Sequence, residues 1–229
     1  MAAEFSGFGE KAIPFLKALG FHQSREWFHE NRALYESQLR EPLGDLVEVL
    51  TERLGAAGLG LKGDRKKSLF RINRDVRFSK DKQPYNRHVS AILSPDGTKM
   101  EQGVLFIYFG IDCCRAAVAW WQPTSELLAA MRKAIAEKPA EFRAMVAALK
   151  KKDLVLDGED ALKRMPRGFE HVTDAELAMA IRNRHFVVRH AIDPGAIHGP
   201  QLADEIVDFT LGAKPLLDWG RKVEGRVTY

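Results

Sequence analysis

The sequence predicts an α+β fold, in which helices from both ends of the chain pack around a mostly antiparallel β-sheet. Three observations support this prediction. Apolar residues recur at helical spacing over residues 11–54, short apolar runs bounded by turn residues occupy 69–121, and helical spacing returns from residue 123. Separate runs of helices and strands are typical of α+β folds.

Three N-terminal helices are expected at residues 11–20, Arg25–Leu39 and Leu43–Leu54. Gly20 follows the last apolar position of the first helix, as expected at a helix end. Ser24 is a suitable N-cap for the second helix, and Pro42 is expected to begin the third.

Four strands are expected next, at Leu69–Ile72, Val89–Leu93, Val104–Ile111 and Cys114–Trp121. The second strand is followed by Ser94-Pro-Asp-Gly97, which is a strong turn signal. The third is a nearly continuous apolar run, so it is predicted to lie in the centre of the sheet.

The C-terminal part is predicted to hold helices at Pro123–Ala136, Pro139–Leu149, Ala175–Arg184 and Pro200–Trp219, and one strand at Phe186–Ile192. Pro215 is expected to break or kink the last helix, and residues 150–173 are expected to be irregular. We therefore expect a single α+β domain over residues 1–229. Its parts are a helical region (11–54), a basic segment with the sheet (62–121), and helices with one further strand (123–220).

The composition is that of an ordinary soluble globular protein, with 45% hydrophobic and 29% charged residues. No run of 18 or more apolar residues occurs, so no membrane span is expected, and the N-terminus lacks the features of a signal peptide. The only cysteines, Cys113 and Cys114, are adjacent, and neighbours on a strand point to opposite faces. An ordinary structural disulfide is not expected, which favours a cytoplasmic location.

Positive charge is concentrated in one segment. Residues 62–88 contain ten Lys and Arg against three Asp, a local charge of +7, whereas the whole chain carries only +4. Concentrated cations interleaved with aromatic residues predict a phosphate-bearing partner.

The candidate ligand-binding residues all lie in this segment: Arg71, Arg74, Arg77, Lys80, Lys82, Tyr85 and Arg87. Arginine presents a planar fork that binds phosphate or carboxylate oxygens bidentately, lysine adds a point charge, and tyrosine offers a stacking face. Four of the cations recur every three residues, which would spread them around a helix, whereas an irregular loop could bring them together.

An alternative interpretation of the same residues remains open. Asp75 and Asp81, together with Glu26, Glu30 and Glu36 of the acidic N-terminal region, could neutralise the arginines in an internal ion-pair web. Function would then lie in protein–protein contacts elsewhere.

A third hypothesis is an enzyme that acts on a phosphorylated or carboxylated small molecule. Asp75, Asp81 and His88 are the candidate acid/base residues. No metal-ligand cluster, nucleotide-binding glycine loop or nucleophile motif is readable, so neither a metal nor a cofactor is predicted. A nucleic acid is a less favoured partner than a small anion, because the net charge is only +4 and the N-terminal region is acidic.

Three stretches resemble the DUF2461 family of uncharacterised bacterial and fungal proteins. They are Arg74–Tyr85 in the basic segment, Arg25–Glu36 in the second helix and Leu162–Phe169 in the irregular region, so the resemblance covers most of residues 5–220. One departure is Ala116-Ala-Val-Ala-Trp-Trp-Gln-Pro123, where the family usually has a glycine cluster before an aromatic residue and a proline. The resemblance implies a single α+β domain and implies no reaction.

Overall fold

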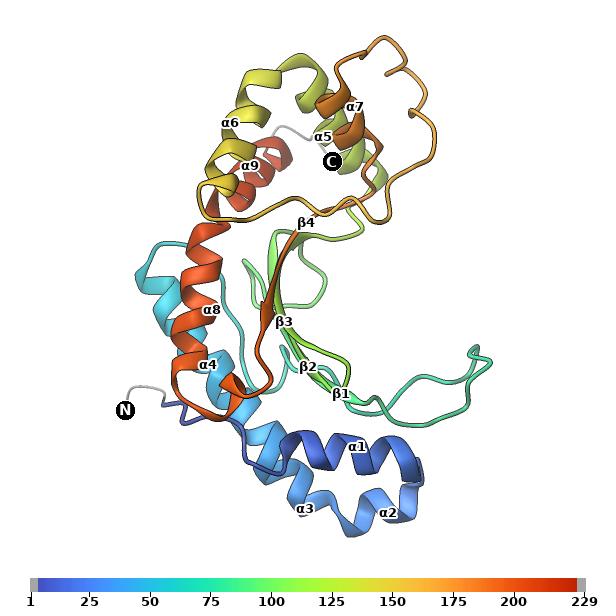
Figure 1. Ribbon diagram of the computed structural model, residues 1–229, viewed down its shortest axis with the longest axis vertical. Helices are drawn as coiled ribbons and strands as arrows, with labels where there is room; N and C mark the ends of the chain where they lie inside the picture. Colours follow the sequence, from blue (N-terminus) through green and yellow to red (C-terminus); the bar gives the residue numbers. More distant parts are fainter. Residues whose placement is uncertain (1–3, 226–229) are drawn as a thin grey trace.

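The computed structural model describes residues 4–225 (Figure 1). The N-terminal helical elements are α1 (Ala12–His22), α2 (Arg25–Glu30), α3 (Arg32–Tyr35), the π-helical turn η1 (Glu36–Arg40) and α4 (Glu41–Ala56). The strands are β1 (His88–Leu93), β2 (Val104–Gly110), β3 (Cys114–Trp120) and β4 (Phe186–Ile192). The remaining helical elements are α5 (Ser125–Glu137), α6 (Pro139–Lys150), α7 (Ala175–Arg182), the 3-10 turn η2 (Ala196–His198), α8 (Gln201–Gly212) and α9 (Lys214–Glu224).

The four strands form one antiparallel sheet in the order β1-β2-β3-β4, which confirms the α+β prediction. The last strand has the predicted bounds, and residues 150–173 contain no regular helix or strand beyond the end of α6. Helices α4 and α8 lie along one face of the sheet (Figure 1), and the side chains that point to them form the main core. Val104, Ala117, Ala119 and Val187 form a second, smaller apolar cluster on the opposite face.

The N-terminal helices differ from the prediction at two points. Residues 25–39 are not one helix, because the chain leaves the helical conformation at Asn31 between α2 and α3. Conversely, no break precedes Pro42, since α3, η1 and α4 follow one another directly. Pro42 has no N–H to donate to the carbonyl of Gln38, and the chain adapts by a π-turn in which the Glu41 N–H donates to the Glu36 carbonyl.

The predicted strand at Leu69–Ile72 is wrong. This segment meets β1 through one isolated bridge, from Leu69 to Ala91, and the next bridge, from Asn73 to Tyr85, lies outside both the segment and β1. The chain bends at Ile72, whose side chain turns into the core, so the regular pairing of a strand cannot continue.

The C-terminal helix is broken as predicted. Helix α8 ends at Gly212, and α9 begins at Lys214 with Pro215 in its first turn. Proline is tolerated there because the first turn of a helix has no intrahelical partner for its N–H groups.

Candidate functional site

Residues 71–87 form a loop, the basic loop, that is fixed at its base. The Arg74 N–H donates to the Pro84 carbonyl and the Asn86 N–H to the Ile72 carbonyl, each at 2.8 Å. The backbone of Tyr85 exchanges two hydrogen bonds with the Gln23 side chain, at 3.0 and 3.2 Å. The far end of the loop is solvated, as the 96% exposed side chain of Phe78 shows.

Tyr85 belongs to the core. Its side chain is 4% exposed, and its ring stacks on Phe28 with the centroids 4.6 Å apart. The ring therefore anchors the loop to α2, and Tyr85 also lines a hollow beside Arg74 and Arg87.

Two of the loop arginines pair with aspartates of the loop itself. Arg74 Nη1 lies 2.7 Å from Asp81 Oδ2 and also donates to the Gln83 carbonyl at 3.2 Å. Arg77 Nη2 lies 2.7 Å from Asp75 Oδ2. The Arg77 guanidinium lowers the pKa of Asp75, and the Arg74 guanidinium lowers the pKa of Asp81.

The other predicted cations have different surroundings. Lys82 Nζ donates to the carbonyls of Val76 and Arg77, at 3.0 and 3.4 Å, so it holds the loop backbone. Within residues 4–225, the side chains of Arg71, Lys80 and Arg87 make no ion pair. The stem of Arg87 passes close to Gly20 of α1, where a Cβ would lie 2.9 Å from Arg87 Cδ.

Two adjoining hollows follow the base of the loop. The smaller, of about 230 Å³, is lined mainly by polar groups, and the larger has about 440 Å³. Arg74, Asn86 and His88 line both hollows. Arg87 lines the smaller and Arg71 the larger, so three of the predicted arginines line these two adjoining hollows, which together are called the depression.

The floor of the depression comes from the sheet. His88 of β1 stacks on Tyr108 of β2, with the ring centroids 4.4 Å apart. The Tyr108 hydroxyl donates to Asp112 Oδ1 at 2.9 Å, and the Arg115 guanidinium lies over the Tyr108 ring at 4.6 Å. Burial lowers the pKa of His88 and raises that of Tyr108. Burial thus favours the neutral imidazole over the charged imidazolium.

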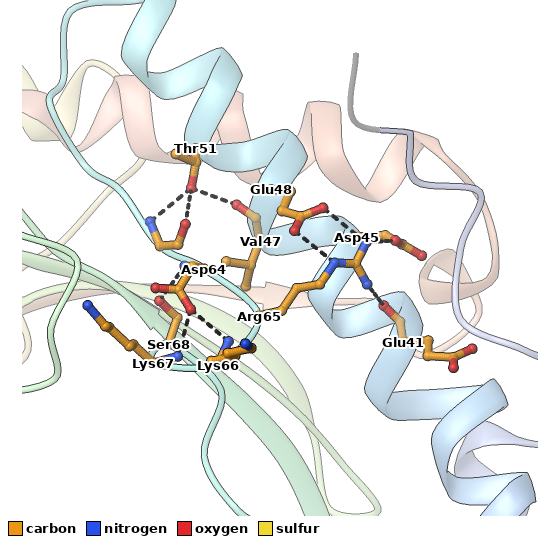
Figure 2. Close-up of polar contacts among 11 residues, drawn as sticks. Glu41, Asp45, Val47, Glu48, Thr51, Asp64, Arg65, Lys66, Lys67 and Ser68 are labelled. Atoms are coloured by element: carbon orange, nitrogen blue, oxygen red, sulfur yellow. Dashed lines mark hydrogen bonds and ion pairs between the residues drawn. The ribbon is translucent and has the colours of Figure 1, made fainter. Parts of the chain in front are cut away.

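Arg65, in the same basic segment, lies in another environment. Figure 2 shows its guanidinium against α4, where Nε donates to Glu48 Oε1 at 2.7 Å and Nη2 contacts Asp45 and Glu48. The chain makes a turn around Arg65. Asp64 closes this turn, because its carboxylate accepts hydrogen bonds from the backbone N–H groups of Lys66 and Lys67 at 2.7 and 2.8 Å. This is the ion-pair web between the basic segment and the acidic N-terminal region.

The acidic partners differ from those expected for such a web. Glu36 pairs with Arg32 and Arg40 of its own helical region. Within the described part of the chain, Glu26 and Glu30 form no ion pair with the arginines of the basic loop. The web thus includes Arg65 and leaves out Arg71, Arg74, Arg77 and Arg87.

Sequence reasoning missed four groups that line the smaller hollow, Gln83, Asn86, Tyr108 and Asp112. Tyr108 carried a readable signal, because it is the one hydroxyl-bearing side chain in the apolar run of β2. Asn86 and Asp112 could not be recognised from the sequence, since a single polar residue in a connection is common.

Two features are absent from residues 4–225. None of the helices there combines the length and the hydrophobicity of a bilayer-spanning segment. Three or more His, Cys, Asp or Glu side chains do not gather anywhere in these residues in a way that could hold a metal ion.

The fold and the depression define an α+β protein with a basic loop beside an antiparallel sheet. The family model of DUF2461, described as a conserved hypothetical protein, matches residues 11–219. The chain therefore belongs to the DUF2461 family, as the motifs in its sequence indicated. Comparison with curated proteins gave no match, and comparison with solved structures gave none.

Proposed function

We propose that this protein recognises a phosphate-bearing or other anionic small molecule through the basic loop, and that the anion binds in the depression lined by Arg71, Arg74 and Arg87. The observation that carries the proposal is the gathering of these three guanidinium groups around one depression, two of them without an ion pair in residues 4–225.

Arg74 is oriented for this role. Only its Nη1 group is hydrogen-bonded within residues 4–225, to Asp81 and to the Gln83 carbonyl. Its Nε and Nη2 groups, which form one edge of the guanidinium fork, remain available for two parallel hydrogen bonds to an anion. Asp81 would fix the direction of the fork, so less side-chain entropy would be lost on binding.

The test is a thermal-shift series at constant ionic strength with inorganic phosphate, pyrophosphate, sulfate, AMP, glucose 6-phosphate, citrate and a short oligonucleotide. The site variant is Arg71→Gln/Arg87→Gln, which removes two charges without leaving a carboxylate unpaired. Its matched control is Lys66→Gln/Lys67→Gln, which removes the same charge from the neighbouring turn, outside both hollows.

A ligand present at 100 times its Kd should stabilise the wild type and the lysine variant by about 2.7 kcal/mol. The arginine variant should lose most of this stabilisation. The proposal fails if none of the anions raises the melting temperature, or if the two variants respond equally. A response to the oligonucleotide that exceeds all small anions and falls steeply with salt would instead indicate nucleic-acid binding.

A second candidate function, catalysis on the bound anion, is favoured by one observation. His88 lines both hollows, and burial lowers its pKa, which favours the neutral, proton-accepting form of the imidazole. Each phosphate ester that binds should then be converted in a reaction visible by ³¹P NMR, and His88→Asn should abolish turnover while Kd changes less than about twofold. Binding without turnover in the wild type would restrict the function to recognition.

A further inference from the structure

A further cavity of about 400 Å³ lies on the face of the sheet opposite α4 and α8, and it shares Phe70 and Phe106 with the larger hollow. Its floor contains Ala117 and Ala119 of β3 with Val104 of β2, all of which belong to the smaller apolar cluster. The register explains the depth of the floor, because Ala117 stands between Phe106 of β2 and Arg189 of β4. The methyl side chains of Ala117 and Ala119 thus leave space on this face that larger side chains would fill.

The walls of the cavity are aromatic. Phe70, Phe106 and Trp121 line it, and the rings of Phe70 and Phe106 meet edge to face with their centroids 6.1 Å apart. Aromatic walls over an apolar floor favour a flat ring system, because offset and edge-to-face contacts add to the burial of apolar area.

The polar groups of the cavity are all cationic. Its lining includes Lys99, Arg115 and Arg189 and no acidic residue. Arg189 contacts Asp157 and lies 3.8 Å from Glu159, so its charge is balanced from outside the cavity.

Within residues 4–225, Lys99 and Arg115 make no such ion pair, although the charge of Asp64 acts on Lys99 and that of Asp112 on Arg115. Lys99 Nζ donates to the Leu69 carbonyl at 2.6 Å and lies 4.8 Å from the Phe70 ring centroid. Arg115 Nη1 donates to Cys113 Sγ at 3.3 Å. In the described residues neither side chain makes an ion pair, although Lys99 is half-buried and burial lowers its pKa. A partly desolvated cation without a counter-ion attracts an anion more strongly than an exposed one.

We propose that this cavity is a second ligand site, adjacent to the larger hollow at the basic loop but lined by different cations, and that it takes a flat aromatic compound bearing one anionic group. The ring system lies between Phe70, Phe106 and Trp121, above Ala117. The anion pairs with Lys99, and the neighbouring Arg115 adds positive potential.

Isothermal titration calorimetry with three probes tests this assignment. 2-Naphthoate carries both the ring system and the anion, 2-naphthylmethanol only the ring system, and acetate only the anion. We expect 2-naphthoate to bind at least tenfold more tightly than either of the other probes. Lys99→Gln should weaken 2-naphthoate to the affinity of 2-naphthylmethanol, whereas Lys151→Gln, an exposed lysine after α6, should leave the affinity unchanged.

The wild-type protein also reports the location of the probe through its alanine methyl groups. Ala117 and Ala119 line the cavity, whereas Ala116 of the same strand is fully buried in the main core. In ¹³C-methyl spectra, 2-naphthoate should shift the resonances of Ala117 and Ala119 and leave that of Ala116 nearly in place. The proposal is overturned if 2-naphthoate does not bind, if Lys99→Gln binds it as the wild type does, or if the shifts occur at the basic loop alone. Because Arg71 and Arg87 do not line this cavity, their variants separate its failure from that of the phosphate site.

Discussion

The turn around Arg65 and the basic loop belong to one basic segment, but their charges have different partners. Arg65 reaches across the fold to Asp45 and Glu48 of α4, carboxylates that lie 17 to 20 residues earlier in the chain (Figure 2). In the loop, Arg74 and Arg77 pair with aspartates seven and two residues away. The ion pairs of Arg65 thereby connect the turn to α4, whereas the ion pairs of Arg74 and Arg77 stay within the basic loop.

This difference shows what decides whether a cluster of cations is structural. Arg65 lies against the acidic surface of α4, so folding itself supplies its counter-ions. The basic loop extends beyond the N-terminal helices (Figure 1), and within residues 4–225 its arginines form ion pairs with the aspartates of the loop alone. Cations that folding does not neutralise remain available to a ligand, and this contrast is the reason to look for an anion at the loop rather than at the turn.

The largest effect on stability is expected where the loop is anchored. Tyr85→Ala removes a ring that is 4% exposed and stacked on Phe28, so we expect a loss of about 3 kcal/mol in the free energy of unfolding. Phe78→Ala, at the exposed end of the same loop, should change it by less than about 0.5 kcal/mol. Urea denaturation measures both. Equal losses would show that the base of the loop is no more structured than its end.

A smaller effect is expected at the web. Arg65→Gln removes contacts to Asp45 and Glu48, but the three side chains are 36 to 43% exposed, so solvent screens the charges. We expect a loss of about 1 kcal/mol, because a network with a bidentate contact exceeds a single surface pair.

Arg77→Gln is the matched variant in the loop. Its side chain is 77% exposed and its partner Asp75 is only two residues away, so its effect on the free energy of unfolding should be undetectable. The contrast between turn and loop is wrong if Arg77→Gln proves as destabilising as Arg65→Gln.

The sequence predicted the helices and strands better than the connections between them. The apolar periods of 89–121 and 186–192 placed all four strands within one or two residues, because alternation and strand burial are local properties. The sequence did not predict that the helical conformation continues through Pro42. The π-turn at this point depends on a hydrogen bond that the Gly9 N–H donates to the Gln38 carbonyl. That contact joins residues 29 positions apart.

The candidate site was likewise predicted only in part. Charge counting located the segment, and the structure gathers Arg71, Arg74 and Arg87 around one depression. Counting could not separate Arg65 from them, because the acidic face of α4 is defined only after α4 packs beside the turn. The aromatic cavity could not be predicted from the sequence either, since it requires the strand register that places Ala117 beside Phe106.

The smallest effect concerns the titration of Asp81. The Arg74 guanidinium is the largest cause of its lowered pKa, and the backbone N–H of Gln83 is the next. In Arg74→Gln, carboxyl ¹³C NMR should therefore show the pKa of Asp81 rising toward its usual value of 3.8, while Asp75, whose pKa depends on Arg77, stays low.

The sign of the linked stability follows from the direction of this shift. A lowered pKa in the folded protein stabilises the fold above the pKa of the unfolded chain, and this contribution is lost as the pH falls through the folded pKa. Because Asp81 is exposed, its contribution is small; the difference in stability between the wild type and Arg74→Gln should be fully present above about pH 4 and disappear as the pH falls through the lowered pKa. An Asp81 titration that is identical in both proteins would mean that Arg74 is not held by Asp81 in solution. The guanidinium fork would then not be oriented before the anion arrives, and binding would have to supply that ordering itself.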